Sequence, residues 1–297
     1  MKQLKNISFG AQSMYHKLES VLIKSAEDAL ISQEYIDKNY QKYNYVSRPI
    51  MNNLRLDFES FENILKNNVK NIYYLSKNLT AGIDSVYVHD TLKVTEKGAI
   101  YFQMGKKLRR KEPELTRKYL ESLGLPTLGI MKGTGTMEGG DVVWIDNKTV
   151  AIGLGYRTNA EGIKQFNKLT KNIVKEVITV PLPHADGNLR VLHLQSLISI
   201  IAPDLIVMYS RYVPVFFREY LLEKDFNIIE VNNKEYLTMG TNVLALSPKK
   251  CVILKGNIHV KREIEEYGGE VFEYDGVDLS MKGEGGPTCM TAPLLRI

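Results

Sequence analysis

Apolar side chains recur at three- and four-residue steps in five separate stretches of the chain. This spacing places them on one face of a helix, and a helix with one apolar face packs against a core. One stretch has the boundary residues of a helix, with Pro113 in its first turn and Gly124 after its end. The predicted helices begin near Asp57, Glu112, Asn159, Tyr212 and Ile258.

Short runs of β-branched and aromatic residues lie between these helices and end at Gly, Asn or Pro. Runs of this kind are typical of strands. If residues 84–90 are part of a strand, alternation would place Asp84 and Asp90 on one face of the sheet and His89 on the other. We predict strands over residues 85–94, 99–103, 142–145, 150–154, 177–180, 205–209, 243–246 and 251–254.

The helices recur at a spacing of roughly 50 residues, in the range of repeated supersecondary units. Two or three strands and one helix, repeated five times, predict a five-bladed pseudosymmetric α/β propeller. An open doubly wound sheet is the alternative, because helices recur at a similar interval in many α/β proteins. No linker interrupts the chain, so we predict a single domain over residues 1–297, in which the weakly patterned residues 26–50 are a candidate lid.

The composition is that of an ordinary folded protein, 44% hydrophobic and 25% charged, and it excludes disordered and low-complexity classes. The net charge of +5 is small and spread in mixed patches, so we expect no nucleic acid partner. Two cysteines are too few for a disulfide framework. No apolar run reaches the ~20 residues that cross a bilayer, and no secretory signal is visible. We therefore expect a cytoplasmic protein without a membrane partner.

Three positions in the chain carry candidate chemistry. Glu138 and Asp141 flank a glycine pair ahead of a predicted strand, which is either an ordinary turn or a place where two carboxylates face a cation. His193 lies in an apolar run, where a histidine is more often a core residue than a catalytic one. Cys289 follows a glycine-rich turn, whereas Cys251 lies in an apolar run typical of an inert thiol.

Acidic and basic side chains upstream offer further sites for ions. Asp84 and Asp90 could bind a cation together, although a solvated face explains them equally well. Arg109 precedes a predicted helix and Arg157 follows a predicted strand. Either guanidinium could bind a carboxylate in bidentate fashion.

Six segments form a larger pattern: residues 84–90, 109–112, 138–141, 153–159, 192–194 and 285–290. In this order they resemble the guanidine-modifying enzymes, namely dimethylarginine dimethylaminohydrolase, arginine deiminase and the amidinotransferases. Several motifs in one order are a more specific signal than any one of them. The resemblance implies the five-bladed pentein fold, which agrees with the helix spacing.

The resemblance also implies roles for the candidate residues. Cys289 would be the nucleophile, His193 the general acid and base, and Glu138 a carboxylate that orients the site or holds the guanidinium. Arginines would receive an α-carboxylate, and acids would hold the cationic part of the substrate. The implied substrate-binding residues are Asp84, Asp90, Asp141, Arg109 and Arg157.

The implied activity is that of a cysteine-dependent hydrolase, which converts arginine or a methylated arginine to citrulline and releases ammonia or an amine. A thiolate attacks the guanidinium carbon while carboxylates fix the plane of the cation, so neither a metal nor a cofactor is expected. Transfer of the amidino group to an acceptor amine is one alternative. A non-catalytic binding protein, like the ribosomal anti-association factor that has this fold, is another. A homo-oligomer is left open.

Two positions depart from the family pattern. Gln195 stands two places after His193, where deiminases carry an aspartate, and this favours methylated arginine. His89 stands where dimethylarginine hydrolases usually carry an acid, and residues 285–290 are more similar to a deiminase. The choice of substrate therefore stays open, with methylated arginine slightly ahead.

Overall fold

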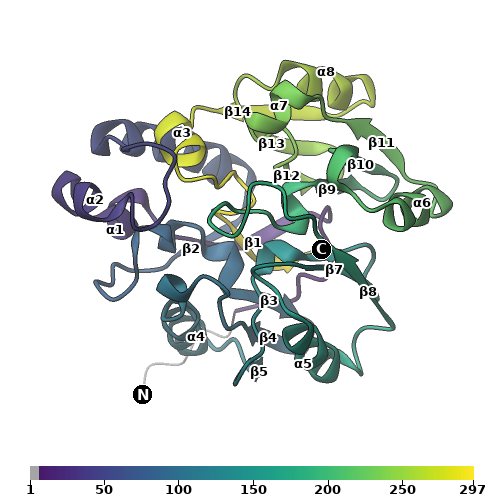
Figure 1. The fold of residues 1–297 in the computed structure, drawn as a ribbon, viewed down its shortest axis with the longest axis horizontal. Helices are drawn as coiled ribbons and strands as arrows, with labels where there is room; N and C mark the ends of the chain where they lie inside the picture. Colours follow the sequence, from purple (N-terminus) through teal and green to yellow (C-terminus); the bar gives the residue numbers. More distant parts are fainter. Residues whose placement is uncertain (1–6) are drawn as a thin grey trace.

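The computed structural model describes residues 7–297, which form five three-stranded sheets arranged around a centre (Figure 1). Every sheet follows one plan: its first strand is antiparallel to the middle strand, and its last strand is parallel to it. Parallel neighbours require a crossover connection, and a helix supplies it in each module. The predicted five-bladed pentein fold is confirmed.

Four modules follow one another in the sequence. One consists of β3 (Leu92–Thr95), β4 (Gly98–Tyr101), α4 (Glu112–Ser122) and β5 (Thr127–Ile130). The next consists of β6 (Val142–Trp144), β7 (Thr149–Leu154), α5 (Ala160–Thr170) and β8 (Glu176–Pro181). The third consists of β9 (Ile198–Ala202), β10 (Leu205–Met208), α6 (Val215–Glu223) and β11 (Asn227–Glu230). After α7 (Asn233–Leu237), the last consists of β12 (Leu244–Ser247), β13 (Lys250–Leu254), α8 (Ile258–Glu266) and β14 (Glu270–Tyr274).

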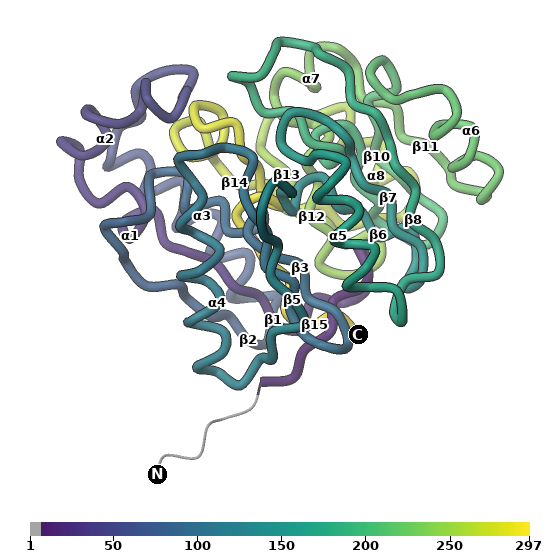
Figure 2. The backbone as a smooth tube through the Cα atoms, turned by 60° about the horizontal axis from the view of Figure 1, so that its bottom comes forward, coloured from purple at the N-terminus to yellow at the C-terminus, as the bar shows by residue number. Residues whose placement is uncertain are grey.

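The remaining module joins the two ends of the chain (Figure 2). Its strands are β15 (Ala292–Arg296), β1 (Leu18–Ile23) and β2 (Asn71–Tyr74), and its helices are α1 (Ala26–Leu30), α2 (Gln33–Asn39) and α3 (Met51–Asn68). Strand β15 pairs antiparallel with β1, so the last strand of the chain closes the ring of modules. Ring closure therefore depends on a contact between residues that are far apart in sequence.

Burial decreases from the middle strands outward. Strand β1 is buried along its whole length, and β10 likewise, whereas the last strands β2, β5 and β11 each expose residues. Each crossover helix buries one face, as the predicted apolar stripe requires. The middle strands β4, β7, β10 and β13 are short apolar runs, and each overlaps a predicted strand, whereas β1 was not predicted.

Three sequence predictions are wrong in detail. Residues 85–94 are not one strand: they form the 3₁₀ turns Ile83–Val86 and Val88–Thr91 and then enter β3. Residues 83–94 are buried throughout, so alternation cannot assign faces there. The helix expected near Tyr212 begins at Val215, because Pro214 disfavours a helical conformation in the residue before it. The helix expected near Asp57 begins earlier, at Met51.

Residues 26–50 contain two short helices, each opened by a serine side chain that accepts a backbone N–H. Tyr43 and Tyr45 of this segment are buried, so it is packed against the rest of the molecule along part of its length. Among residues 7–297, no helix combines the length and the apolar character that a membrane crossing requires.

Candidate active site

Turns and connections, rather than strands, line a cleft on one face of the ring. Two adjoining cavities of about 20 and 220 Å³ make up this cleft. Both are lined by Val191, His193, Glu284 and Cys289. His193 and Cys289, which are separated by almost a hundred positions in the sequence, therefore lie on the wall of one cleft.

The narrower cavity holds most of the site residues expected from the sequence. It is lined by Asp84, Asp90, Arg109, Arg157, His193 and Cys289. Glu138 and Asp141 are wholly buried and do not line it. Both nevertheless reach the histidine segment, by the contacts described next.

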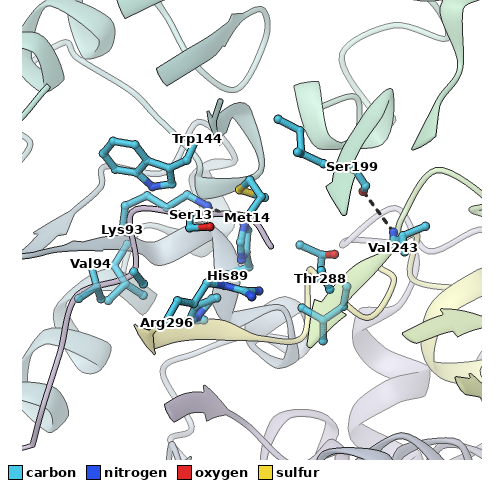
Figure 3. Close-up of a pocket in the computed structure, with 17 residues that line it drawn as sticks. Ser13, Met14, His89, Lys93, Val94, Trp144, Ser199, Val243, Thr288 and Arg296 are labelled. Atoms are coloured by element: carbon cyan, nitrogen blue, oxygen red, sulfur yellow. Dashed lines mark hydrogen bonds between the residues drawn. The ribbon is translucent and has the colours of Figure 1, made fainter. Parts of the chain in front are cut away.

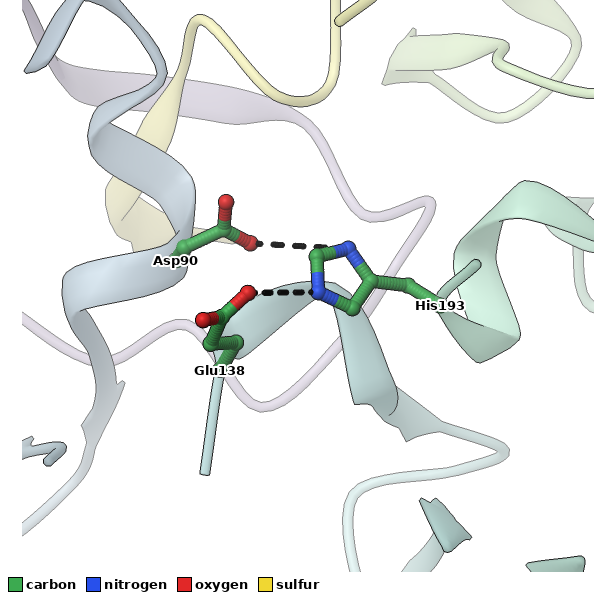
Figure 4. A group of neighbouring side chains, drawn as sticks. All are labelled: Asp90, Glu138 and His193. Carbon is green, nitrogen blue, oxygen red and sulfur yellow. Dashed lines mark hydrogen bonds and ion pairs between the residues drawn. The ribbon is translucent and has the colours of Figure 1, made fainter. Parts of the chain in front are cut away.

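His193 is held by two carboxylates (Figure 4). Its Nε2 lies 2.9 Å from Oε2 of Glu138, and its Nδ1 lies 3.9 Å from Oδ1 of Asp90. Burial opposes the charged imidazole, but Asp90, Asp141 and Glu138 outweigh it and raise the pKa of His193 to about 9. At neutral pH His193 is therefore an imidazolium, able to donate a proton to a leaving group.

Glu138 also holds a second cation. Its Oε2 accepts from Nη1 of Arg157 at 3.1 Å, and its Oε1 accepts from the backbone N–H of Lys106 at 2.9 Å. Burial by itself would raise the pKa of Glu138, but Arg157 and His193 reverse this and hold the pKa well below its usual range. Glu138 is therefore a fixed anion that orients both His193 and Arg157.

Asp141 supports the histidine from behind. Its Oδ1 accepts from the backbone N–H of Leu194 at 3.0 Å, and its Oδ2 accepts from Thr158 Oγ1 at 2.6 Å. Burial raises the pKa of Asp141 to about 6. The expectation that Asp141 binds substrate disagrees with these contacts, because both oxygens are used within the protein and neither faces the cleft.

The glycine pair between Glu138 and Asp141 is explained by close approach. A Cβ on Gly140 would lie 2.3 Å from Nδ1 of His193, and one on Gly139 would lie 2.1 Å from the carbonyl oxygen of His89. Any side chain at Gly140 would displace the imidazole. The segment from Glu138 to Asp141, which the sequence left open as a turn or a site, therefore packs directly against the ring of His193.

Arg109 is fixed by the protein's own acids. Its Nη1 donates to Asp90 Oδ2 at 2.6 Å, its Nε and Nη2 donate to Glu112, and Nη2 also donates to the carbonyl of Tyr87. The residue is only 3% exposed. These contacts make Arg109 the group that fixes Asp90. Arg109 also lines the narrower cavity, so its contact with a substrate carboxylate stays a prediction.

Lys106 is a site residue that the sequence analysis missed. Its Nζ donates to Asp84 Oδ2 and to the carbonyl oxygen of Tyr43, both at 2.6 Å. It therefore connects a predicted substrate-binding acid to the candidate lid segment, whose residues Tyr43 and Asn44 line the narrower cavity. Lysines are common on surfaces, so nothing in its local sequence distinguished Lys106.

The thiol of Cys289 is half-buried at the end of a glycine-rich loop. Nδ2 of Asn242 donates to its Sγ at 3.3 Å, and Oδ1 of Asn242 accepts from the backbone N–H of Thr288 at 3.0 Å. Burial, with the charge of Asp90, raises the pKa of Cys289 to about 11. Without a ligand the sulfur is a thiol at neutral pH. The sequence analysis missed the contact of Asn242 with Cys289, because an asparagine before a predicted strand is too common to indicate such a role.

The two residues that depart from the family pattern, Gln195 and His89, lie in different places. Gln195 donates its Nε2 to the carbonyls of Gly139 and Val142, and it lines the wider cavity, where its buried Oε1 has no partner among the described residues. His89 points away from the cleft, toward Lys93 and the carbonyl of Thr291. Gln195 is therefore placed to affect substrate choice, and His89 is not.

Asp90, Glu138 and His193 offer donor atoms within 4.8 Å of one another, a set that could ligate a divalent cation. A metal requires a neutral imidazole, and the raised pKa of His193 opposes its loss of a proton at neutral pH. The same anionic arrangement suits an organic cation, which leaves the histidine protonated.

Comparison with known proteins identifies relatives of this chain. A relative from Bacillus subtilis (strain 168), the uncharacterized protein YkgA, is 28% identical over 213 residues, which are 72% of this chain and 70% of YkgA. The arginine deiminase of Mycobacterium avium (strain 104) is 25% identical over 194 residues, 55% of this chain and 47% of the deiminase. The chain thus spans about half the length of that deiminase.

Solved structures share the fold. Dimethylarginine dimethylaminohydrolase from Pseudomonas aeruginosa, a cysteine-to-serine mutant complexed with citrulline, superposes with a TM-score of 0.75 at 21% identity, covering 93% of this chain and 99% of the other. SxtG, an amidinotransferase from Microseira wollei, gives a TM-score of 0.76 at 15% identity and 97% coverage of both chains. At these identities the likeness concerns the fold.

The family described as N,N dimethylarginine dimethylhydrolase, eukaryotic, matches residues 27–296. This match covers nearly the whole chain, including every segment that lines the cleft. The chain belongs to the dimethylarginine dimethylaminohydrolase family of guanidine-modifying proteins.

Proposed function

We propose that this protein hydrolyses an arginine-like guanidino compound through a covalent intermediate on Cys289. The observation that carries the proposal is the convergence of Cys289, His193 and the carboxylate of Asp90 on one narrow cavity. A sulfur nucleophile, a protonated imidazole and a fixed anion are the groups that guanidine hydrolysis needs. Residues 1–297 would act as a single catalytic domain.

The cation of the substrate would be oriented by acids before any bond changes. Asp90 is fixed by Arg109 and lies on the cavity wall with Asp84. Arg157 lines the same cavity, and we assign it the α-carboxylate of the substrate. The Lys106 ammonium beside Asp84 would have to move or share that acid when a cation binds.

Binding of the cation would also prepare the nucleophile. A positive charge near a thiol lowers its pKa, and the pKa of Cys289 starts at about 11. The thiol then loses its proton to solvent, and the sulfur forms a bond to the guanidinium carbon. The bond from that carbon to the leaving nitrogen breaks, and the imidazolium of His193 donates a proton to the departing amine.

Hydrolysis of the amidino-thioether would complete the cycle. His193, now neutral, takes a proton from a water molecule as its oxygen attacks the amidino carbon. The carbon–sulfur bond breaks, the hydroxyl proton of the adduct passes to the departing sulfur, the thiol of Cys289 is restored, and citrulline leaves. Citrulline is bound in the fold relative from Pseudomonas aeruginosa, which supports this product.

Methylated arginine is the favoured substrate. Gln195 offers a neutral amide in the wider cavity, where an aspartate would instead bind unsubstituted nitrogens as the deiminases do. The wider cavity of about 220 Å³ adjoins both Cys289 and His193, so it has room for a substituted leaving group. This step concerns specificity and is separate from the nucleophilic chemistry.

The test is turnover of arginine, monomethylarginine, dimethylarginine and agmatine, measured as ureido product and released amine. We expect methylated arginine to be the best substrate, and agmatine, which lacks a carboxylate for Arg157, to be the poorest. Cys289→Ala should lower kcat by at least about 10³-fold. The matched control is Cys251→Ala, at a buried thiol of β13 that does not line the cleft.

Two alternatives give other results. An amidinotransferase, as the fold likeness to SxtG allows, would accumulate the covalent intermediate and turn over only when an acceptor amine is added. A non-catalytic binding protein would show no Cys289-dependent turnover of any guanidino compound. Turnover in water alone, lost in Cys289→Ala and kept in Cys251→Ala, separates hydrolysis from both.

A further inference from the structure

Another cavity lies at the centre of the ring, and Figure 3 shows the residues that line it. The first strand of every module contributes to its wall, so it occupies the axis of the pseudosymmetric fold. The space open to the centre of a water-sized group is about 30 Å³. Each of these five strands contributes at least one lining residue, for example Lys93, Trp144, Ser199, Ala245 and Arg296.

The polar atoms that face this cavity without a partner are hydrogen-bond donors. Trp144 Nε1, Thr288 Oγ1 and Arg296 Nε are buried and make no hydrogen bond within residues 7–297. Trp144 is 1% exposed, Thr288 6% and Arg296 8%. Native proteins seldom leave such groups unsatisfied, so three around one small space call for an occupant.

Lys93 adds a fourth donor. His89 donates from Nδ1 to the carbonyl of Thr291 at 2.8 Å, which leaves its Nε2 as an acceptor for Nζ of Lys93, also at 2.8 Å. The ammonium keeps two further N–H groups. No ion pair involves Lys93 or Arg296 within the described chain, and no acid is among the residues that line the cavity.

We propose that the axial cavity binds a small inorganic anion of the chloride class. Two buried basic side chains and two neutral donors converge on it, and no carboxylate balances them there. Burial outweighs the charge of Asp90 and lowers the pKa of Lys93 to about 7, and it lowers the pKa of Arg296 to about 9, as expected for buried cations that form no ion pair. An anion would satisfy the donors and restore the charge balance.

Size and hydrogen-bonding capacity argue against other occupants. One water needs ~10–15 Å³ by the same measure, so the cavity takes an ion or about two waters and excludes an amino acid. A water also donates hydrogen bonds, and of the three unpartnered side-chain atoms at this cavity only the hydroxyl of Thr288 can accept one. A halide ion only accepts hydrogen bonds, so it suits a cavity surrounded by hydrogen-bond donors.

The occupant would contact the catalytic segments from behind. Thr288 immediately precedes Cys289, and His89 immediately precedes Asp90. The backbone N–H of His89 donates to the carbonyl of Cys289 at 3.1 Å, which joins the two segments. An anion in the cavity would thus stabilise the packing on which the cleft is built, whichever reaction the cleft performs.

Bromide provides a direct test. Crystals of the full chain grown with sodium bromide should show an anomalous scattering peak between Lys93, Trp144, Thr288 and Arg296. In solution, replacing gluconate by chloride at equal ionic strength should raise Tm saturably, by about 2–6 °C. Lys93→Met should fold and lose this shift, whereas Lys255→Met, at an exposed lysine paired with Asp275, should keep it.

Thr288→Val removes one donor without a change of size, and it should weaken the chloride-dependent rise in Tm while the fold is retained. It serves as the second variant if Lys93→Met is unstable. The proposal is overturned if the cavity holds no bromide in the crystals, or if both variants respond to chloride as the unmodified protein does. Loss of turnover in the substrate assay would leave these halide measurements unaffected, so the two proposals fail separately.

Discussion

At the scale of single residues, surroundings decide which of two thiols can react. Cys251 lies within β13, and burial raises the pKa of its thiol well above the ordinary value. Cys289 is also raised, to about 11, but it lines a cleft and accepts a hydrogen bond from Asn242. A cation that enters the cleft can change the ionisation of Cys289, and nothing can enter beside Cys251.

This difference predicts that the Cys289 thiol ionises when a guanidinium ligand binds. Ultraviolet difference spectra at neutral pH should show little thiolate in the free protein, and the thiolate band should appear when a slowly reacting guanidinium ligand binds. The Cys289→Ser variant should show no such band. A full thiolate band in the free protein at neutral pH would instead mean that His193 and Cys289 already form an ion pair.

The raised pKa of His193 predicts a pH-dependent stability. The unfolded histidine titrates near pH ~6.5, and the folded one near 9, so its stabilising effect is complete below pH ~6.5 and is lost as pH rises through 9. The free energy of unfolding of the unmodified protein should therefore fall relative to His193→Gln across this interval. Urea denaturation of both proteins over the pH range measures it. A constant difference would contradict the charged state assigned to His193.

At the scale of elements, short turns rather than strands carry the site. Asp84 and Asp90 lie on or beside 3₁₀ turns, and Glu138 precedes another such turn, Gly139–Asp141. The sequence patterns predicted the crossover helices, which bury one face periodically. They also predicted the middle strands β4, β7, β10 and β13, which are short runs of mostly buried residues, but not the equally buried β1. They did not give the turns, because residues 83–94 are buried without periodicity. They also missed the half-exposed outer strands β2 and β5.

Close packing of the glycine turn predicts the effect of one methyl group. Gly140→Ala should displace the His193 ring and lower kcat by about 10²-fold, since small displacements of catalytic groups are this costly. Gly155→Ala is the control, because its Cβ would meet its nearest neighbour, Leu182 Cδ1, at 3.3 Å. Steady-state kinetics should separate the two variants. Equal activity would show that His193 does not need its present position.

At the scale of the whole molecule, the ring is closed by a contact between chain ends. Strand β15 pairs with β1, and Leu294 of β15 is fully buried whereas the neighbouring Ile297 is 64% exposed. The first strand of each module surrounds the axial cavity, so closure also forms that cavity. The cleft residues come from connections on one face of this ring.

If pairing of β15 closes the ring, two similar side-chain truncations near the C-terminal end should lower the free energy of unfolding by different amounts. Leu294→Ala should lower the free energy of unfolding by about 2–5 kcal/mol. Ile297→Ala should change it by no more than about 0.5 kcal/mol, since its side chain is largely exposed. Urea denaturation measures both. Similar costs for the two variants would mean that β15 contributes little to closing the ring.

The order of motifs and the helix spacing were enough to identify the family, the five-bladed fold and the candidates Cys289, His193 and Glu138. These follow from the sequence because periodic burial and motif order are local properties of the chain. Contacts corrected the assignment of Asp141, whose carboxylate is bound by the protein's own groups, and showed that Arg109 fixes Asp90. Those contacts join distant segments, so no local pattern records them.

The amino-acid sequence by itself determined which elements form and which reactive groups are available. Only the tertiary structure decided which charges face each other, and therefore the protonation states of His193 and Cys289. It also decided that Lys93 and Arg296 share an axial cavity without an acid. The physical reason is that electrostatic interactions and burial depend on distances in space, which ring closure sets between residues far apart in the chain.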